Sequence, residues 1–121
     1  MSHITIAGRT IGRGNPPYVI AELSANHNGD LDQALKIIDA AADAGADAVK
    51  IQTYRADTIT LQSDDPDFQI TEGQWAGHTL YDLYEWAHTP WEWHGALVAH
   101  ARSRNITLFS SPFDTTAADL L

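Results

Sequence analysis

The sequence predicts an α/β fold built on a parallel sheet, and two observations lead to this prediction. Apolar runs of strand length occur at residues 18–22, 46–52 and 106–110, and such runs are typical of strands buried on both faces of a parallel sheet. Each run is followed by a polar loop and then by helical spacing or a helix-capping residue. Strand-then-helix units therefore recur along the chain.

The first part of the chain contains a predicted hairpin, a strand and a helix. Residues 4–12 alternate apolar and polar side chains around a Gly-Arg pair, which predicts a small hairpin. The run at residues 18–22 ends in Glu22, so this carboxylate is expected at the carboxyl edge of the sheet. Asp30 is placed to cap a helix that Gly45 closes.

The rest of the chain contains two more predicted strands. Residues 46–52 complete a β-α-β unit, for which a right-handed crossover and a parallel pair are expected. Residues 53–77 have weak periodicity and predict a long loop over the strand ends. The remaining predicted elements are helices at residues 80–87 and about 90–103, a strand at 106–110, and a helix that Asp114 caps.

The chain is too short to form a complete barrel. A TIM (β/α)8 barrel needs about 250 residues, and the chain has 121. We therefore expect residues 1–121 to be the N-terminal part of such a barrel, covering about its first three β/α units. The alternative is a three-stranded remnant of a doubly wound sheet. Expressed alone, the piece would expose apolar strands, and we expect it to be inactive.

Composition and charge argue against several classes of protein. Seven Lys+Arg against 16 Asp+Glu give a formal net charge of -9, which disfavours binding to nucleic acid and to anionic membranes. The absence of cysteine excludes disulfides and thiolate metal sites. No apolar run approaches the roughly 20 residues of a membrane span, and the start lacks a signal-peptide pattern. We expect a cytoplasmic protein.

Two polar motifs end the first two predicted strands. AELSANHNG contains Glu22, and its Asn-His-Asn-Gly segment is also good turn chemistry without any ligand. KIQTY places Lys50 inside an apolar strand, where a lysine either pairs with a carboxylate or holds an anion. Because side chains alternate along a strand, Lys50 and Gln52 share one face. These residues are candidates for binding a substrate.

Two further motifs follow. LYDLYEWAHTPWEWH, at residues 80–94, predicts an aromatic packing layer of Trp86, Trp91 and Trp93 rather than direct ligand contact. Its two histidines are six residues apart and do not form an i, i+4 zinc pair. FSSPFD, at residues 109–114, places two hydroxyls at a strand end ahead of a helix, where they either bind a phosphate or form a turn and cap.

The four motifs, in this order, resemble the sialic acid (nonulosonate) synthase family over nearly the whole chain, and AELSAN with AHTPWEWH resembles its pseudaminic acid branch. The resemblance implies condensation of phosphoenolpyruvate with a 2,4-diacetamido-2,4,6-trideoxy-altrose type of sugar, giving pseudaminic acid and phosphate. It also implies a small antifreeze-like C-terminal domain, a homodimer, and a divalent metal (Mn or Mg) whose ligands lie outside this chain.

The same resemblance implies roles for five residues. Lys50 and Ser111 should contact phosphoenolpyruvate, and Ser111 stands where relatives commonly have Thr. Gln52 and Glu22 should face the sugar. Glu22 and Asp82 are the implied catalytic residues, Glu22 for proton handling or for stabilising positive charge at C2.

Three alternatives stay open. The first is an N-acetylneuraminate synthase that uses N-acetylmannosamine. The second is another barrel enzyme, such as an aldolase in which Lys50 forms a Schiff base. The third is a non-catalytic binding or assembly module derived from a barrel.

Overall fold

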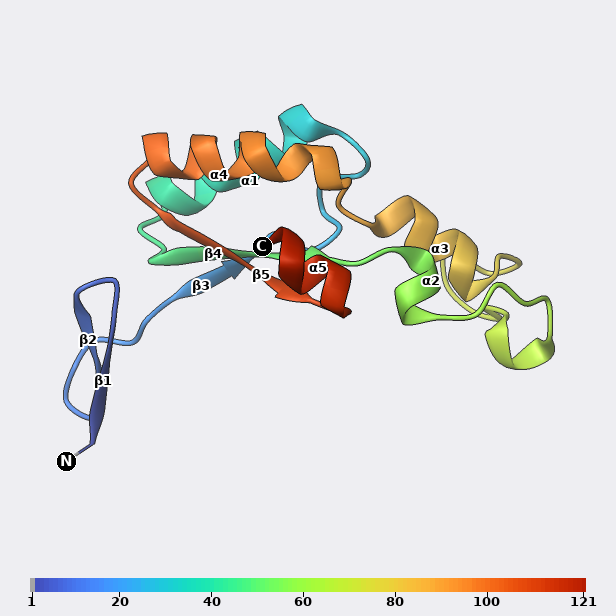
Figure 1. The fold of residues 1–121 in the computed structure, drawn as a ribbon, viewed down its shortest axis with the longest axis horizontal. Coiled ribbons are helices and arrows are strands. Elements are labelled where there is room, and N and C mark those ends of the chain that lie inside the picture. The colour runs from blue at the N-terminus through green and yellow to red at the C-terminus, as the bar shows by residue number, and fades with distance from the viewer. Residues whose placement is uncertain (1) are drawn as a thin grey trace.

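The computed structural model describes residues 2–121 and contains two separate sheets. Strands β1 (His3–Ile6) and β2 (Arg9–Gly12) form an antiparallel hairpin that projects from the body (Figure 1). Its two turn residues, Ala7 and Gly8, both have positive φ, as a tight two-residue hairpin turn requires. The predicted hairpin is confirmed.

The body is built on a parallel sheet of three strands in the order β3-β4-β5. Each strand begins one or two residues later than predicted, and the α/β class with parallel neighbours is confirmed. The strands are β3 (Ile20–Glu22), β4 (Ala48–Thr53) and β5 (Thr107–Pro112).

The two faces of this sheet carry different side chains. We call the face covered by helices the back face and the opposite one the front face; alternation and strand register define both. The back face carries Val49, Ile51, Thr53, Leu108 and Ser110. The front face carries Ile20, Glu22, Lys50, Gln52, Phe109 and Ser111.

Helices α1 (Leu31–Asp43) and α4 (His94–Ser103) lie side by side over the back face (Figure 1). The Asp30 carboxylate caps α1 by accepting the Asp32 N–H at 2.9 Å, and Gly45 follows the helix with φ 82. Burial of each large aliphatic side chain here stabilises the fold by about 1.5–3 kcal/mol. The fully buried members of this core are Leu23, Ala34, Ile38, Val49, Ile51 and Leu97.

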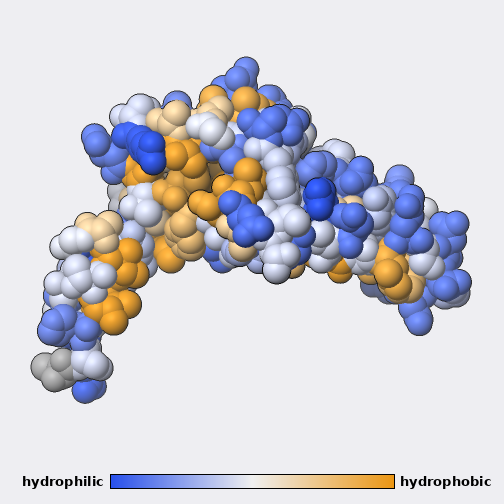
Figure 2. Space-filling model, in the orientation of Figure 1, coloured by the Kyte–Doolittle hydropathy of each residue, from blue (hydrophilic) through white to orange (hydrophobic). Residues whose placement is uncertain are grey.

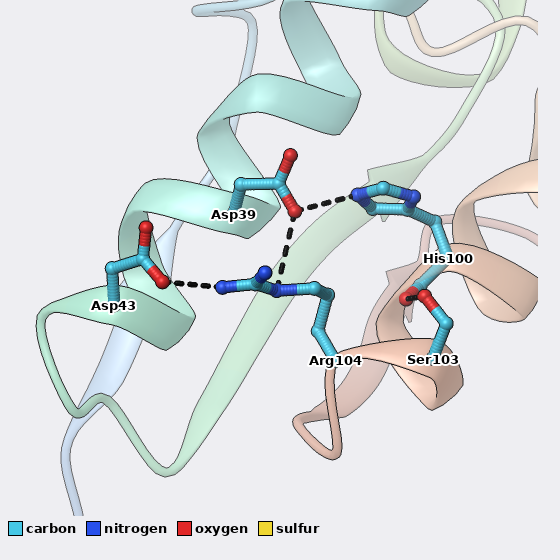
Figure 3. Close-up of polar contacts among 5 residues, drawn as sticks. All are labelled: Asp39, Asp43, His100, Ser103 and Arg104. Atoms are coloured by element: carbon cyan, nitrogen blue, oxygen red, sulfur yellow. Dashed lines mark hydrogen bonds and ion pairs between the residues drawn. The ribbon is translucent and has the colours of Figure 1, made fainter.

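A cluster of ion pairs joins α1 and α4 at the outer surface (Figure 3). The Asp39 carboxylate accepts a hydrogen bond from His100 Nε2 at 2.8 Å and lies 3.3 Å from Arg104 Nε. Arg104 also contacts Asp43. Since these side chains are partly exposed, each pair contributes at most about 1 kcal/mol. The cluster aligns two helices that apolar packing already holds together.

The segment predicted as one long loop contains two short helices. Each is about one turn long, which is too short to produce a helical pattern in the sequence. Together with the predicted helix at residues 80–87, they form a lobe beyond the end of β4 (Figure 1). The predicted helix from Pro90 is divided, with a 3-10 turn ahead of α4. These elements are α2 (Ala56–Ile59), η1 (Pro66–Phe68), α3 (Leu80–Ala87) and η2 (Trp91–Trp93).

The last helix, α5 (Thr115–Leu120), begins at Asp114, whose carboxylate accepts the Ala117 N–H at 2.9 Å. A cavity of about 670 Å³ lies between α4, β5 and α5 and is lined by Ile51, Val98 and Leu108 among others. Figure 2 shows apolar surface in the middle of the body and on the hairpin. Within residues 2–121, no helix combines the length and the apolar character needed to cross a bilayer.

Candidate functional site

Two predicted site residues form an ion pair between the carboxyl end of β3 and the middle of β4. Glu22 and Lys50 are register partners, and Lys50 Nζ lies 2.8 Å from Glu22 Oε1. Their side chains are 53% and 31% exposed, respectively, so both remain accessible to a ligand. A lysine in this strand was expected either to pair with a carboxylate or to hold an anion. Lys50 does pair with a carboxylate, and that carboxylate is itself a candidate site residue.

Gln52 and Ser111 lie one step further along the same face. They are register partners on β4 and β5, and partners on parallel strands project to the same side. Gln52 is two residues after Lys50 and so shares its face. Ser24, in the loop after β3, lies with its hydroxyl 3.5 Å from Gln52 Oε1. The structure thus brings four of the five predicted residues to the carboxyl edge of the front face.

Asp82, the fifth predicted residue, lies in the first turn of α3 and forms a capping box with Thr79. Its carboxylate accepts the Thr79 N–H at 3.0 Å, and Thr79 Oγ1 accepts the Asp82 N–H at 3.1 Å. The hydrogen bond from the Thr79 backbone is the largest cause that lowers the pKa of Asp82 below its usual value. In the part of the chain that the structure describes, no hydrogen bond or ion pair joins Asp82 to Glu22 or Lys50.

A buried polar chain behind the site was not predicted. Thr53 Oγ1 lies 2.8 Å from His94 Nε2 and 2.6 Å from Ser110 Oγ. Thr53 is fully buried and His94 is nearly so. The sequence carried a signal, since hydroxyl residues next to Gln52 and Ser111 must project to the back face. What the sequence did not indicate is that His94, 41 residues after Thr53, reaches them.

His27 is another buried polar residue, in the loop between β3 and α1. Its Nδ1 accepts the Gly29 N–H at 3.0 Å, and its Nε2 is buried with no hydrogen bond of normal geometry among residues 2–121. Burial is the main cause that lowers the pKa of His27 below 6.5, and the nearby His88 lowers it further. The ring is therefore neutral at pH 7. The turn interpretation of this motif is confirmed, since Gly29 and the residue before it both have positive φ.

The three tryptophans have different environments. Trp93 packs against the core and edge-on to His27, with ring centroids 5.2 Å apart, as the packing interpretation predicts. Trp91 lies under the Arg55 guanidinium at 4.9 Å. Trp86 is 41% exposed and contacts Trp75. The packing layer is thus confirmed for Trp93, while Trp86 is largely at the surface.

Among residues 2–121, no three His, Asp or Glu side chains come together as a group that could hold a metal ion. The described residues therefore do not form a metal centre by themselves. What the front face offers is an ammonium group, a carboxylate, an amide and a hydroxyl at one edge. This set of groups can bind an anionic, oxygen-rich molecule and place a carboxylate beside it.

Three comparisons bear on identity. The chain is 56% identical over 96 residues to pseudaminic acid synthase from Campylobacter jejuni, covering 79% of this chain and 28% of that protein. It is 46% identical over 106 residues to pseudaminic acid synthase from Helicobacter pylori, covering 88% of this chain and 31% of that protein. The crystal structure of N-acetylneuraminic acid (sialic acid) synthetase from Leptospira borgpetersenii superposes with a TM-score of 0.78 at 31% identity, covering 99% of this chain and 37% of that one.

The chain thus spans between 28% and 37% of the length of these relatives. Residues 37–121 match the NeuB family, a stretch that includes β4, β5 and the Lys50, Gln52 and Ser111 positions. Together with the two synthases above, this match shows that the chain belongs to the NeuB family.

Proposed function

We propose that residues 1–121 are the N-terminal part of an enzyme that makes pseudaminic acid and phosphate from phosphoenolpyruvate and a 2,4-diacetamido-2,4,6-trideoxy-altrose type of sugar. Identity of 56% and 46% to two pseudaminic acid synthases supports this branch of nonulosonate synthesis. The proposal includes a TIM (β/α)8 barrel, of which this chain forms the first three units. Three sequential parallel strands with helices between them support it.

The observation that carries the proposal is the position of Lys50 on the front face, beside Glu22 at the end of β3 and on the same side of β4 as Gln52. A chain with a net charge of -9 needs a local cation to hold phosphoenolpyruvate, which is itself an anion. We assign this binding to Lys50, with the Ser111 hydroxyl as a further donor. The incoming anion then competes with Glu22 for the Lys50 ammonium.

In the proposed reaction, C3 of phosphoenolpyruvate forms a bond to the aldehyde carbon of the sugar, and the aldehyde oxygen takes up a proton. The positive charge that develops at C2 is stabilised by the Glu22 carboxylate, and Gln52 holds the sugar end. Water adds at C2, loses a proton, and the tetrahedral intermediate expels phosphate by cleavage of its C–O bond. Asp82 is proposed to lie near the sugar in the full-length protein.

The homodimer, the antifreeze-like C-terminal domain and a divalent metal are proposals for the full-length protein. The described residues 2–121 contain no group of three metal-ligating side chains, and none of the roles assigned here depends on a metal. The chain alone, with its front face half covered, is expected to be inactive.

The test is an assay of the full-length protein for phosphate release, with the sugar product identified by mass spectrometry. We expect turnover with phosphoenolpyruvate, a divalent metal and the 2,4-diacetamido sugar, and none when any of the three is omitted. Equal or faster turnover of N-acetylmannosamine would show that the proposed sugar is wrong and would support an N-acetylneuraminate synthase. Trapping of a borohydride-reducible adduct on Lys50 would support an aldolase instead.

A further inference from the structure

A chain of side-chain hydrogen bonds crosses from the helix layer to the ends of two strands. It runs from the Trp91 carbonyl, 3.1 Å from His94 Nδ1, through His94 Nε2 to Thr53 Oγ1 at 2.8 Å, and on to Ser110 Oγ at 2.6 Å. Ser110 Oγ also lies 3.2 Å from the Ile51 carbonyl. The chain thus connects the turn before α4 to the carboxyl ends of β4 and β5.

The acceptors around His94 fix its tautomer. Carbonyl oxygens of Pro90 and Trp91 face Nδ1, and a carbonyl can only accept, so in the neutral ring the proton is on Nδ1. Nε2 then accepts from the Thr53 hydroxyl, and the Ser110 hydroxyl donates to Thr53 Oγ1 or to Ile51. Loss of Thr53 Oγ1 therefore removes the side-chain partner of the buried His94 Nε2 and leaves the Ser110 hydroxyl with the Ile51 carbonyl alone.

The position of this chain matters because each hydroxyl residue neighbours a site residue. Thr53 directly follows Gln52, and Ser110 directly precedes Ser111, on the opposite face of the same two strands. Beyond this point the backbone ladder ends, with Phe113 N–H donating to the Thr53 carbonyl at 3.2 Å. The hydrogen-bond ladder between two strands opens most easily at their ends. A side-chain connection at this point fixes the positions of the two strand ends relative to each other.

We propose that His94, Thr53 and Ser110 are positioning residues that set the places of Gln52 and Ser111 at the substrate site. The inference rests on the proposed function for its catalytic consequence. Its structural part, the connection between the strand ends, stands independently of that function. The three side chains act through the backbone and do not touch substrate.

The structural part is tested by amide hydrogen exchange in the full-length protein. Thr53→Val removes the hydroxyl at nearly constant shape. Thr107→Val makes the same change at the amino end of β5, away from the hydrogen bonds of His94, Thr53 and Ser110. We expect exchange at the Ser111 and Phe113 amides to accelerate about tenfold in Thr53→Val and to be unchanged in Thr107→Val. Equal exchange in the two variants would overturn the proposal.

The catalytic part is tested by steady-state kinetics on the same variants, expressed per folded molecule. Because misplacement by about 1 Å can cost about 100-fold, we expect kcat to fall about 10- to 100-fold in Thr53→Val, with a smaller change in KM for phosphoenolpyruvate. Thr53→Ser, which keeps the hydroxyl, should recover most of kcat. A merely structural role would lower the folded fraction and leave kcat per folded molecule unchanged, and that result would overturn the assignment.

The two arms separate this proposal from the function on which it rests. If the wild-type protein does not release phosphate with any of the sugars, the proposed function fails, and the amide exchange alone decides whether the strand ends are connected. If the wild type is active and Thr53→Val retains full kcat, the function stands and the positioning role is wrong.

Discussion

The back face and the front face of the same three strands differ in how completely they are covered. On the back face, Val49, Ile51 and Thr53 are fully buried under α1 and α4. On the front face, Ile20 is 42% and Phe109 is 39% exposed, and they flank the Glu22–Lys50 pair. One face therefore holds the sheet and helices together, while the other carries the candidate site. Substitutions on the two faces should report on different properties.

The largest effect is expected from Lys50→Met on the front face. Removing the charged partner of a bound anion costs about 2–5 kcal/mol of binding free energy, so affinity for phosphoenolpyruvate should fall by roughly 30- to several thousand-fold. Binding is measured by calorimetry on the full-length protein. Lys36→Met, at an exposed position of α1, is the matched control. A variant that unfolds, yet binds normally per folded molecule, would make Lys50 a structural residue.

The second prediction removes the contrast between the faces. In a closed barrel the front face lines the interior, so Ile20→Ala should cost as much stability as Ile51→Ala in the full-length protein, about 2–5 kcal/mol each. Chemical denaturation measures both. If Ile20→Ala costs less than about 0.5 kcal/mol there, as a surface substitution does, the front face is open in the intact protein and the barrel proposal fails.

A smaller effect is expected from His27, which is buried in the loop between β3 and α1. Its pKa is lowered from 6.5 because burial disfavours the charged ring. The folded state therefore binds this proton less readily than the unfolded state does. The contribution of the neutral His27 ring to the free energy of unfolding is fully present above pH 6.5. This contribution decreases as the pH falls toward the folded-state pKa. The loss is less than about 1.4 kcal/mol per pH unit, the limit for one proton.

Melting temperatures at about pH 7.5 and about pH 5.5 test this. The wild type should lose more stability on acidification than His27→Asn, which cannot take up the proton. His3→Asn, at an exposed position of β1, should behave as the wild type does. An identical acid response in His27→Asn would assign the pH dependence to other groups.

Much of this arrangement could be predicted because local rules govern it. The hairpin, the Asp30 cap and the strand ends follow from turn, capping and periodicity rules, and alternation alone places Lys50 and Gln52 on one face. Thr79 and Asp82 also have the spacing of a capping box, which the sequence alone shows. The family resemblance instead implied a role near the sugar for Asp82.

The remainder depends on contacts between distant residues. Thr53 meets Ser110 across 57 positions of sequence, and no periodicity marks such a pair. The full burial of His27 depends on Trp93, which arrives from the turn before α4. The short helix α2 is too brief to produce a periodic signal. Tertiary packing determined each of these features.

The strand order β3-β4-β5 has a consequence for how the chain emerges from the ribosome. In this sheet β4 pairs with β3 and β5 pairs with β4, so each finds a partner that has already been made. At about 5–20 residues per second, translation delivers each β/α unit over a few seconds, while local pairing takes far less time. The nascent sheet of β3, β4 and β5 therefore grows by addition at one edge, first at β4 and then at β5.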